Sequence, residues 1–264
     1  MSSGEVTASA AVHTESLSRR QLLNETWLVL GVSLGASAIW SVLSLVRKLT
    51  AEAALNQQTT AMNSSVTPDR PWLDLAYQVT GIVLALVPVV LALHLLRRGR
   101  PDAHHEIGAD LRRPGQDLLR GAVLAAAVGI PGLALYAGAR ALGLNTTVAA
   151  ANLGDQWWTL PVLVLAAAEN AVVEEVVMVG YLFTRWRQVG WSVPVVIGLS
   201  AVIRGTYHLY QGFGGFIGNV AMGLLFGWVY TRTRRVGPLV VAHTLLDVVA
   251  FVGYALLRDR LSWL

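Results

Sequence analysis

The sequence predicts an all-α polytopic membrane protein, a bundle of about seven transmembrane helices with a polar site inside it. Three observations lead to this fold class. Hydrophobic residues make up 54% of the 264 residues and charged residues only 14%, against about 25% charge in a typical soluble domain. Apolar stretches of roughly 20 residues, the length that a helix needs to cross a bilayer, recur along the chain. They are continuous rather than alternating, which excludes a transmembrane barrel.

The chain divides into a short tail and one helical bundle. Residues 1–23 are rich in Ser, Thr, Ala and Glu, and we expect this polar tail to be disordered. Residues 24–158 would form the N-terminal transmembrane helices, and residues 159–257 would form a core that holds nearly all ionisable groups at membrane depth. An eighth segment would follow if one stretch were re-entrant. The predicted spans are 26–46, 72–96, 119–142, 159–183, 191–209, 213–231 and 238–257.

Basic residues predict how the chain crosses the membrane. Arginine is concentrated in every second connection between the predicted spans, and Lys and Arg are enriched on the cytoplasmic side of a membrane. We therefore predict a multi-pass protein of the cell membrane with a cytoplasmic N-terminus. The same topology explains the 20 basic residues, so the expected partners are the lipid bilayer and a substrate, and not nucleic acid. The absence of cysteine excludes disulfides and a cysteine nucleophile.

Two adjacent carboxylates, Glu174 and Glu175, lie in the middle of an apolar span. An ionisable group at this depth costs a few kcal/mol and therefore indicates a functional site. Neighbouring side chains on a helix point about 100° apart, so we expect one glutamate to line a cavity and the other to make a structural contact. Glu169 lies roughly 120–140° around the helix from the pair, which favours a structural role for it.

Later spans supply partners for the glutamate pair. Arg204 and His208 are four residues apart and share a helix face, and so do His243 and Asp247. Arg204 is deep in a span and needs an anion, for which the glutamate pair is the obvious candidate. An aspartate can also hold one tautomer of a histidine.

Two histidines and a glutamate are a set that zinc can use. The sequence contains no HExxH pattern, so three separate helices would have to supply Glu174, His208 and His243. We therefore favour a site without a cofactor, with zinc as the alternative.

Three short patterns follow one another in the second half of the chain. Residues 174–180 read EEVVMVG, residues 204–208 read RGTYH and residues 243–247 read HTLLD. In order and spacing they resemble the motifs of the CAAX protease and bacteriocin-processing (CPBP, Abi-like) family of intramembrane endopeptidases, which includes the Ras-converting CAAX endopeptidase. The first of those motifs is a Glu pair followed by three residues, Arg and usually Gly. The second is Phe followed by three residues and His. The third is His followed by three residues and Asn or sometimes Asp. The resemblance covers residues 159–257.

The resemblance implies a role for each of these residues. Glu174 and His208 would activate the attacking water. His243, with Asp247, would polarise the scissile carbonyl or stabilise the oxyanion. Glu175 would give structural or electrostatic support. The family has been described as metalloproteases and also as glutamate-dependent without metal, and we favour the glutamate–histidine mechanism.

This chain departs from the family pattern at three positions. Val179 stands where the motif has Arg, Arg204 stands where it has Phe, and Asp247 stands where Asn is more usual. We hypothesise that Arg204 supplies, against Glu175, the cation that position 179 would otherwise give. An ionised aspartate cannot donate a hydrogen bond to an oxyanion, which puts a donor role for Asp247 in question.

The predicted function is an intramembrane endopeptidase that hydrolyses a peptide bond near the membrane surface. Its substrate would be a peptide precursor or a membrane-anchored protein, with a CAAX-type tail as one form. The departures favour an alternative, a catalytically inactive family member that acts as a membrane immunity or scaffold protein. A proton-coupled transporter is a third hypothesis, weakened by the lack of evident inverted repeats. Catalysis also requires tilted, short or re-entrant helices, because straight spans would place Glu174, His208 and His243 at different depths.

Overall fold

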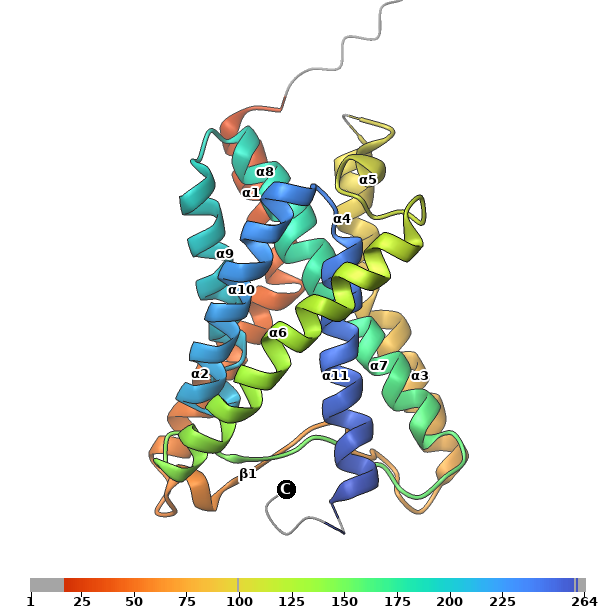
Figure 1. Ribbon diagram of the computed structural model, residues 1–264, viewed down its shortest axis with the longest axis vertical. Coiled ribbons are helices and arrows are strands. Elements are labelled where there is room, and N and C mark those ends of the chain that lie inside the picture. Colours follow the sequence, from red (N-terminus) through yellow and green to blue (C-terminus); the bar gives the residue numbers. More distant parts are fainter. Residues whose placement is uncertain (1–16, 99, 259, 261–264) are drawn as a thin grey trace, which may run out of the picture.

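In the computed structural model the chain forms a bundle of helices (Figure 1). The structure describes residues 17–98, 100–258 and 260. The α-helices are α1 (Arg19–Gly31), α2 (Leu34–Leu49), α3 (Pro71–Ala85), α4 (Val87–Arg97), α5 (Ala103–Glu106), α6 (Pro114–Ala141), α7 (Thr159–Glu174), α8 (Leu182–Gln188), α9 (Val193–Tyr207), α10 (Phe213–Thr233) and α11 (Gly237–Leu257). The shorter elements are the 3₁₀ turns η1 (Leu55–Gln57) and η3 (Leu209–Gln211), the π-helix η2 (Glu175–Tyr181) and the strands β1 (Thr59–Ala61) and β2 (Thr147–Ala149).

The predicted fold class is confirmed: the protein is an all-α multi-pass membrane protein. Among the described residues, four helical stretches are long and apolar enough to cross a membrane, namely α3 with α4, α6, α10 and α11, or five if α1 and α2 count as one bent span. The other two predicted spans coincide with the run from α7 to α8 and with α9, which has 15 residues. Large apolar side chains such as Trp27, Trp40 and Val123 are exposed on the outside, as a surface in contact with lipid requires. The sidedness of the chain stays a prediction.

The predicted span 26–46 is broken, which its prediction as a continuous span did not anticipate, whereas the predicted span 72–96 lies within one candidate span, Pro71–Arg97, that is interrupted only at Leu86. α1 and α2 meet at an angle of 53°. α3 ends before Leu86 and α4 follows at once, because Pro88 has no N–H to continue the helical hydrogen bonds. The predicted tail 1–23 also ends too late, because Ser18 and Gln21 form a capping box that starts α1 at Arg19. Residues 1–16 lie outside the described residues.

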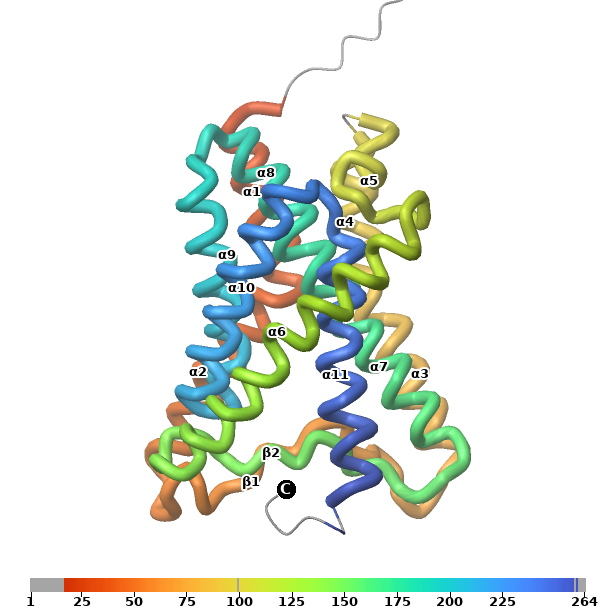
Figure 2. The backbone as a smooth tube through the Cα atoms, in the orientation of Figure 1, coloured from red at the N-terminus to blue at the C-terminus, as the bar shows by residue number. Residues whose placement is uncertain are grey.

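The helices that carry the candidate site residues pack directly on one another. α7, η2 and α8 form one uninterrupted run through the bundle (Figure 2), and α11 packs against α6 and α7. α9 packs against α10, where a Cβ added to Gly223 would lie 2.8 Å from the Cα of Ala201. Only a glycine lets the two backbones approach so closely.

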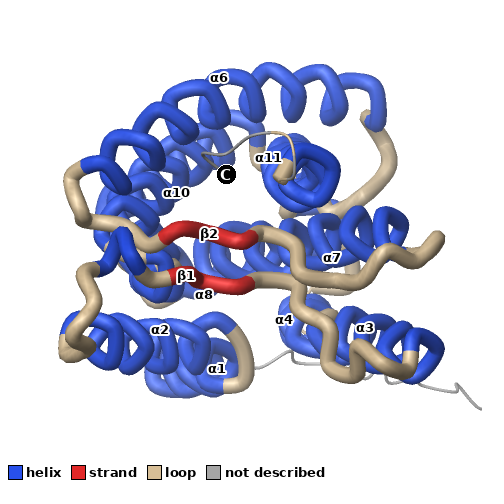
Figure 3. The backbone as a smooth tube through the Cα atoms, turned by 90° about the horizontal axis from the view of Figure 1, so that it is seen from below, coloured by secondary structure: helices blue, strands red, loops and turns tan. Residues whose placement is uncertain are grey.

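One end of the bundle is covered by a two-stranded parallel sheet. Thr60 of β1 is paired with Val148 of β2. Seen from below, the two strands lie side by side across the end of the bundle, between α1 to α4 on one side and α6, α10 and α11 on the other (Figure 3). Lys48 at the end of α2 is buried here and donates hydrogen bonds to the Thr60 hydroxyl and to the carbonyl of Tyr210. The sheet thereby holds the loop that follows α9.

The other end of the bundle is held by an ionic cluster around Arg235, between α10 and α11. Its guanidinium donates to both carboxylate oxygens of Asp117, at 3.0 and 2.7 Å, and to Oδ1 of Asp110 at 3.0 Å. Burial alone would raise the pKa of Asp110, but hydrogen bonds from the Arg112 backbone and from the side chains of Arg235 and His105 outweigh it and lower this pKa to about 2. The cluster therefore depends on an ionised Asp110.

Candidate active site

Glu174 and Glu175 lie about halfway along the run from α7 to α8, at the point where the α-helix widens into the π-helix η2. Short π-helical segments are rare and often occur at functional sites. The side chain of Glu175 is fully buried, and Glu174 is 8% exposed. Arg204 reaches both carboxylates, with Nη2 2.7 Å from Glu175 Oε1 and Nη1 3.3 Å from Glu174 Oε2. One planar guanidinium therefore bridges the two glutamates, while Glu174 lines a cavity and Glu175 makes buried contacts, as expected from the sequence.

Arg204 is itself completely buried. Its guanidinium lies 5.7 Å from the centre of the Phe226 ring on α10, and its Nε and Nη1 have no hydrogen-bond acceptor among the described residues. The contact with Glu175 is the one proposed for a relocated arginine. The position of Arg204 on α9 thus brings a cation to the glutamate pair although residue 179 is a valine.

His243 on α11 forms the next layer of the site. Its Nδ1 lies 2.8 Å from Glu175 Oε1, and because a carboxylate only accepts, Nδ1 carries the hydrogen. Its Nε2 lies 3.7 Å from Asp247 Oδ2, which is longer than a hydrogen bond. The Asn170 side chain hydrogen-bonds to Asp247 from α7. Asp247 is therefore an acceptor here, in agreement with the doubt about a donor role.

His208 caps the C-terminal end of α9, one turn after Arg204. Its Nδ1 donates to the backbone carbonyl of Arg204 at 3.1 Å, which leaves Nε2 as the basic nitrogen. The imidazole interacts electrostatically with Glu174 but makes no hydrogen bond to it in the described part of the chain. Arg204, in the last turn of the 15-residue helix α9, contacts both glutamates, so α9 ends beside the pair. A short helix thus resolves the conflict of depths that straight, full-length spans would create.

Sequence reasoning missed two parts of this arrangement. The hydroxyl of Tyr207 donates to Glu174 Oε2 at 2.6 Å, so this tyrosine fixes one oxygen of the glutamate and leaves Oε1 without a partner among the residues that the structure describes. Ser41 and Lys48 on α2 hold Tyr210, whose N–H donates to Ser41 Oγ at 2.7 Å. The position of Tyr207 next to His208 could have pointed to it, but nothing in the sequence links α2 to the loop after α9.

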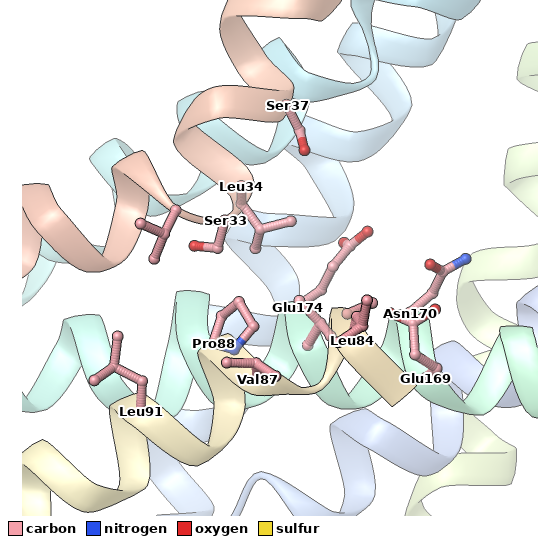
Figure 4. Close-up of a pocket in the computed structure, with 13 residues that line it drawn as sticks. Ser33, Leu34, Ser37, Leu84, Val87, Pro88, Leu91, Glu169, Asn170 and Glu174 are labelled. Atoms are coloured by element: carbon pink, nitrogen blue, oxygen red, sulfur yellow. The ribbon is translucent and has the colours of Figure 1, made fainter. Parts of the chain in front are cut away.

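A cavity of about 530 Å³ reaches Glu174 from the side of the two broken helix pairs. Figure 4 shows Glu174 pointing from α7 toward the segment that carries Leu34 and Ser37, with Val87 and Pro88 of α4 nearby. Glu169 also lines this cavity, so the structural role expected for it from its helical angle does not describe its position. Glu174 is thus the member of the glutamate pair that lines the cavity.

The donor atoms that could hold a metal ion differ by one residue from the set expected from sequence. Among the described residues, Glu174, Glu175 and His243 offer atoms within 4.8 Å of one another. His208, which the sequence offered as a ligand, is not part of this group.

A match to a known protein family covers the same region of the chain. Residues 156–249 match the family model described as Rce1-like, type II CAAX prenyl endopeptidase Rce1-like. The resemblance predicted from the three motifs is confirmed. The matched segment runs from the loop before α7 into α11, so it includes every site residue predicted from the sequence, but not the α2 and α4 residues that the structure adds. No curated protein and no solved structure matches the chain.

Proposed function

We propose that this protein is an intramembrane endopeptidase that hydrolyses a peptide bond in a membrane-anchored protein or peptide, with water activated by Glu174. The observation that carries the proposal is the convergence of Arg204, His208 and His243 from two further helices on Glu174, which itself lines a cavity. The family match supports the reaction class. The partner of the reaction is thus a peptide chain that enters the cavity from its open side.

Glu174 is suited to act as the general base. Tyr207 and Arg204 both contact Oε2, so Oε1 remains to accept a proton from a water molecule in the cavity. The water oxygen then attacks the carbonyl carbon. When the C–N bond breaks, the proton held by Glu174 passes to the leaving nitrogen, which yields a free amine and a new carboxylate. His208, through Nε2, would hold the water for this attack.

His243 is suited to stabilise the negative charge that develops on the carbonyl oxygen. Glu175 fixes its Nδ1 at 2.8 Å, while Asp247 at 3.7 Å stabilises a positive charge on the ring without occupying Nε2. A protonated Nε2 can therefore donate to the oxyanion. In this mechanism Asp247 supports His243 and does not touch the substrate, which removes the difficulty that an aspartate is a poor donor.

The donor set fits a site without metal better than a zinc site. Glu175 Oε1 already accepts hydrogen bonds from both Arg204 and His243. A dication bound by Glu174, Glu175 and His243 would lie beside the guanidinium of Arg204, and like charges in a buried site repel strongly. Arg204 occupies the electrostatic position that a metal ion would take, and we favour the glutamate-dependent mechanism for this reason.

The experiment is a cleavage assay with the purified full chain in lipid nanodiscs. The probes are fluorogenic peptides with and without a farnesyl group near the C-terminus, because the matched family is described as prenyl endopeptidases. We expect cleavage by the wild type and loss of cleavage in Glu174→Gln, with Glu52→Gln, an exposed loop residue, as the charge-matched control. A wild type that cleaves no peptide of the panel would favour a catalytically inactive protein with an immunity or scaffold role.

A further inference from the structure

Glu169 is a carboxylate without a partner in the cavity that leads to Glu174. It lies on α7, is half-buried, and lines the cavity together with Asn170 and Glu174. Within the described residues it has no hydrogen bond and no ion pair, and the charged groups that act on it are Glu174 and Asp247, both negative. A carboxylate in a partly apolar cavity with only like charges beside it either takes up a proton or is stabilised by a cation that joins it.

Two of the cations among the described site residues already contact other carboxylates. Arg204 pairs with both members of the glutamate pair, and His243 lies between Glu175 and Asp247. Even with both histidines protonated, the carboxylates of Glu169, Glu174, Glu175 and Asp247 outnumber the cations Arg204, His208 and His243 by four to three. With all four carboxylates ionised the cavity carries one uncompensated negative charge, and among these four Glu169 is the one that has no cationic partner in the described part of the chain.

We infer that Glu169 is a specificity-determining residue that selects substrates with a lysine or arginine side chain close to the scissile bond. This inference rests on the proposed peptidase function and adds the substrate class. Glu169 and Glu174 are five residues apart on one helix, or about 7.5 Å along its axis. An extended peptide rises about 3.3 Å per residue, so the cationic side chain lies about two residues from the bond that is cleaved.

The test measures binding rather than cleavage, so that it is independent of turnover. The probes are fluorescein-labelled peptides whose central peptide bond is N-methylated and resists hydrolysis. Each pair of peptides differs only in Lys or norleucine two positions before or two positions after that bond. Binding to the full chain is measured by fluorescence anisotropy in a neutral maltoside detergent.

We expect the wild type to bind the Lys peptide about tenfold more tightly than the norleucine peptide on one side of the bond, the value of one charge-assisted contact at a partly exposed group. Glu169→Gln should abolish this preference, and Glu52→Gln should keep it. Glu169→Ser is a second variant should the glutamine protein not fold.

Equal affinities of both peptides for the wild type on both sides, no binding of either peptide, or an unchanged preference in Glu169→Gln would each overturn the inference. A protein that prefers the Lys peptide but cleaves nothing would instead contradict the proposed function alone. The two failures are therefore distinguishable.

Discussion

Removal of Arg204 tests the electrostatic basis of the site. Arg204→Ala leaves two buried carboxylates without their common cation, and His243 remains the one nearby group that still contacts Glu175. Breaking a buried ion pair by removing one partner costs about 3–5 kcal/mol. For a protein of this size each kcal/mol lowers the apparent Tm by about 2–4 °C, so we expect a decrease of about 6–20 °C. Activity should also be lost, because Glu174 loses the cation that orients it.

The assay is thermal unfolding in detergent followed by intrinsic fluorescence, since the chain contains nine tryptophans and no cysteine for a thiol-reactive dye. Arg47→Ala is the matched control, because Arg47 is exposed at the end of α2. Adding Glu175→Gln to Arg204→Ala should restore part of the lost stability, because it removes the uncompensated charge. An Arg204→Ala protein as stable and active as Arg47→Ala would refute the reasoning.

Three further predictions follow from other parts of the structure. Lys48→Met should lower kcat about 10–100-fold with little change in KM. Lys48 holds the Tyr210 carbonyl two residues after His208, and misplacement of a reacting group such as His208 has effects of this size. Steady-state cleavage kinetics measure the effect, and an unchanged kcat would contradict the positioning role of Lys48. The stability that Asp110 contributes should be complete above pH 4 and disappear as the pH falls to about 2, because its pKa is lowered from 3.8 to about 2. The difference in Tm between the wild type and Asp110→Asn should therefore decrease as the pH is lowered over that range. A difference in Tm that stays constant would show that the ionisation of Asp110 is not the source of this stability. Incubation with a strong zinc chelator should leave cleavage unchanged, whereas loss of cleavage that added zinc restores would support a metalloprotease.

The components of the candidate site could be singled out from the sequence because ionisable residues within apolar spans are few. Glu174, Arg204, His208 and His243 stand out against apolar surroundings, and their order resembles a known family. The pairing of Arg204 with the glutamates followed from the need of a buried cation for an anion. None of these steps required knowledge of how the helices are arranged.

The sequence did not reveal the local distortions that bring these residues together. The break between α1 and α2, the π-helix that starts at Glu175 and the early end of α9 at Tyr207 all depend on tertiary packing. Hydropathy responds to the length of an apolar stretch and not to its interruption, so it predicted continuous spans. Helical angles also misjudged Glu169, because a cavity that follows the helix surface can include side chains that are far apart in angle.

The central claim is that Glu174 activates a water molecule for hydrolysis of a peptide bond inside the bundle. The most direct measurement is cleavage of a peptide substrate in ¹⁸O-labelled water by the full chain in nanodiscs, with the products analysed by mass spectrometry. The account predicts one ¹⁸O atom in the new carboxylate formed by the wild type and no product above background with Glu174→Gln. Cleavage by Glu174→Gln at the rate of the wild type would contradict it.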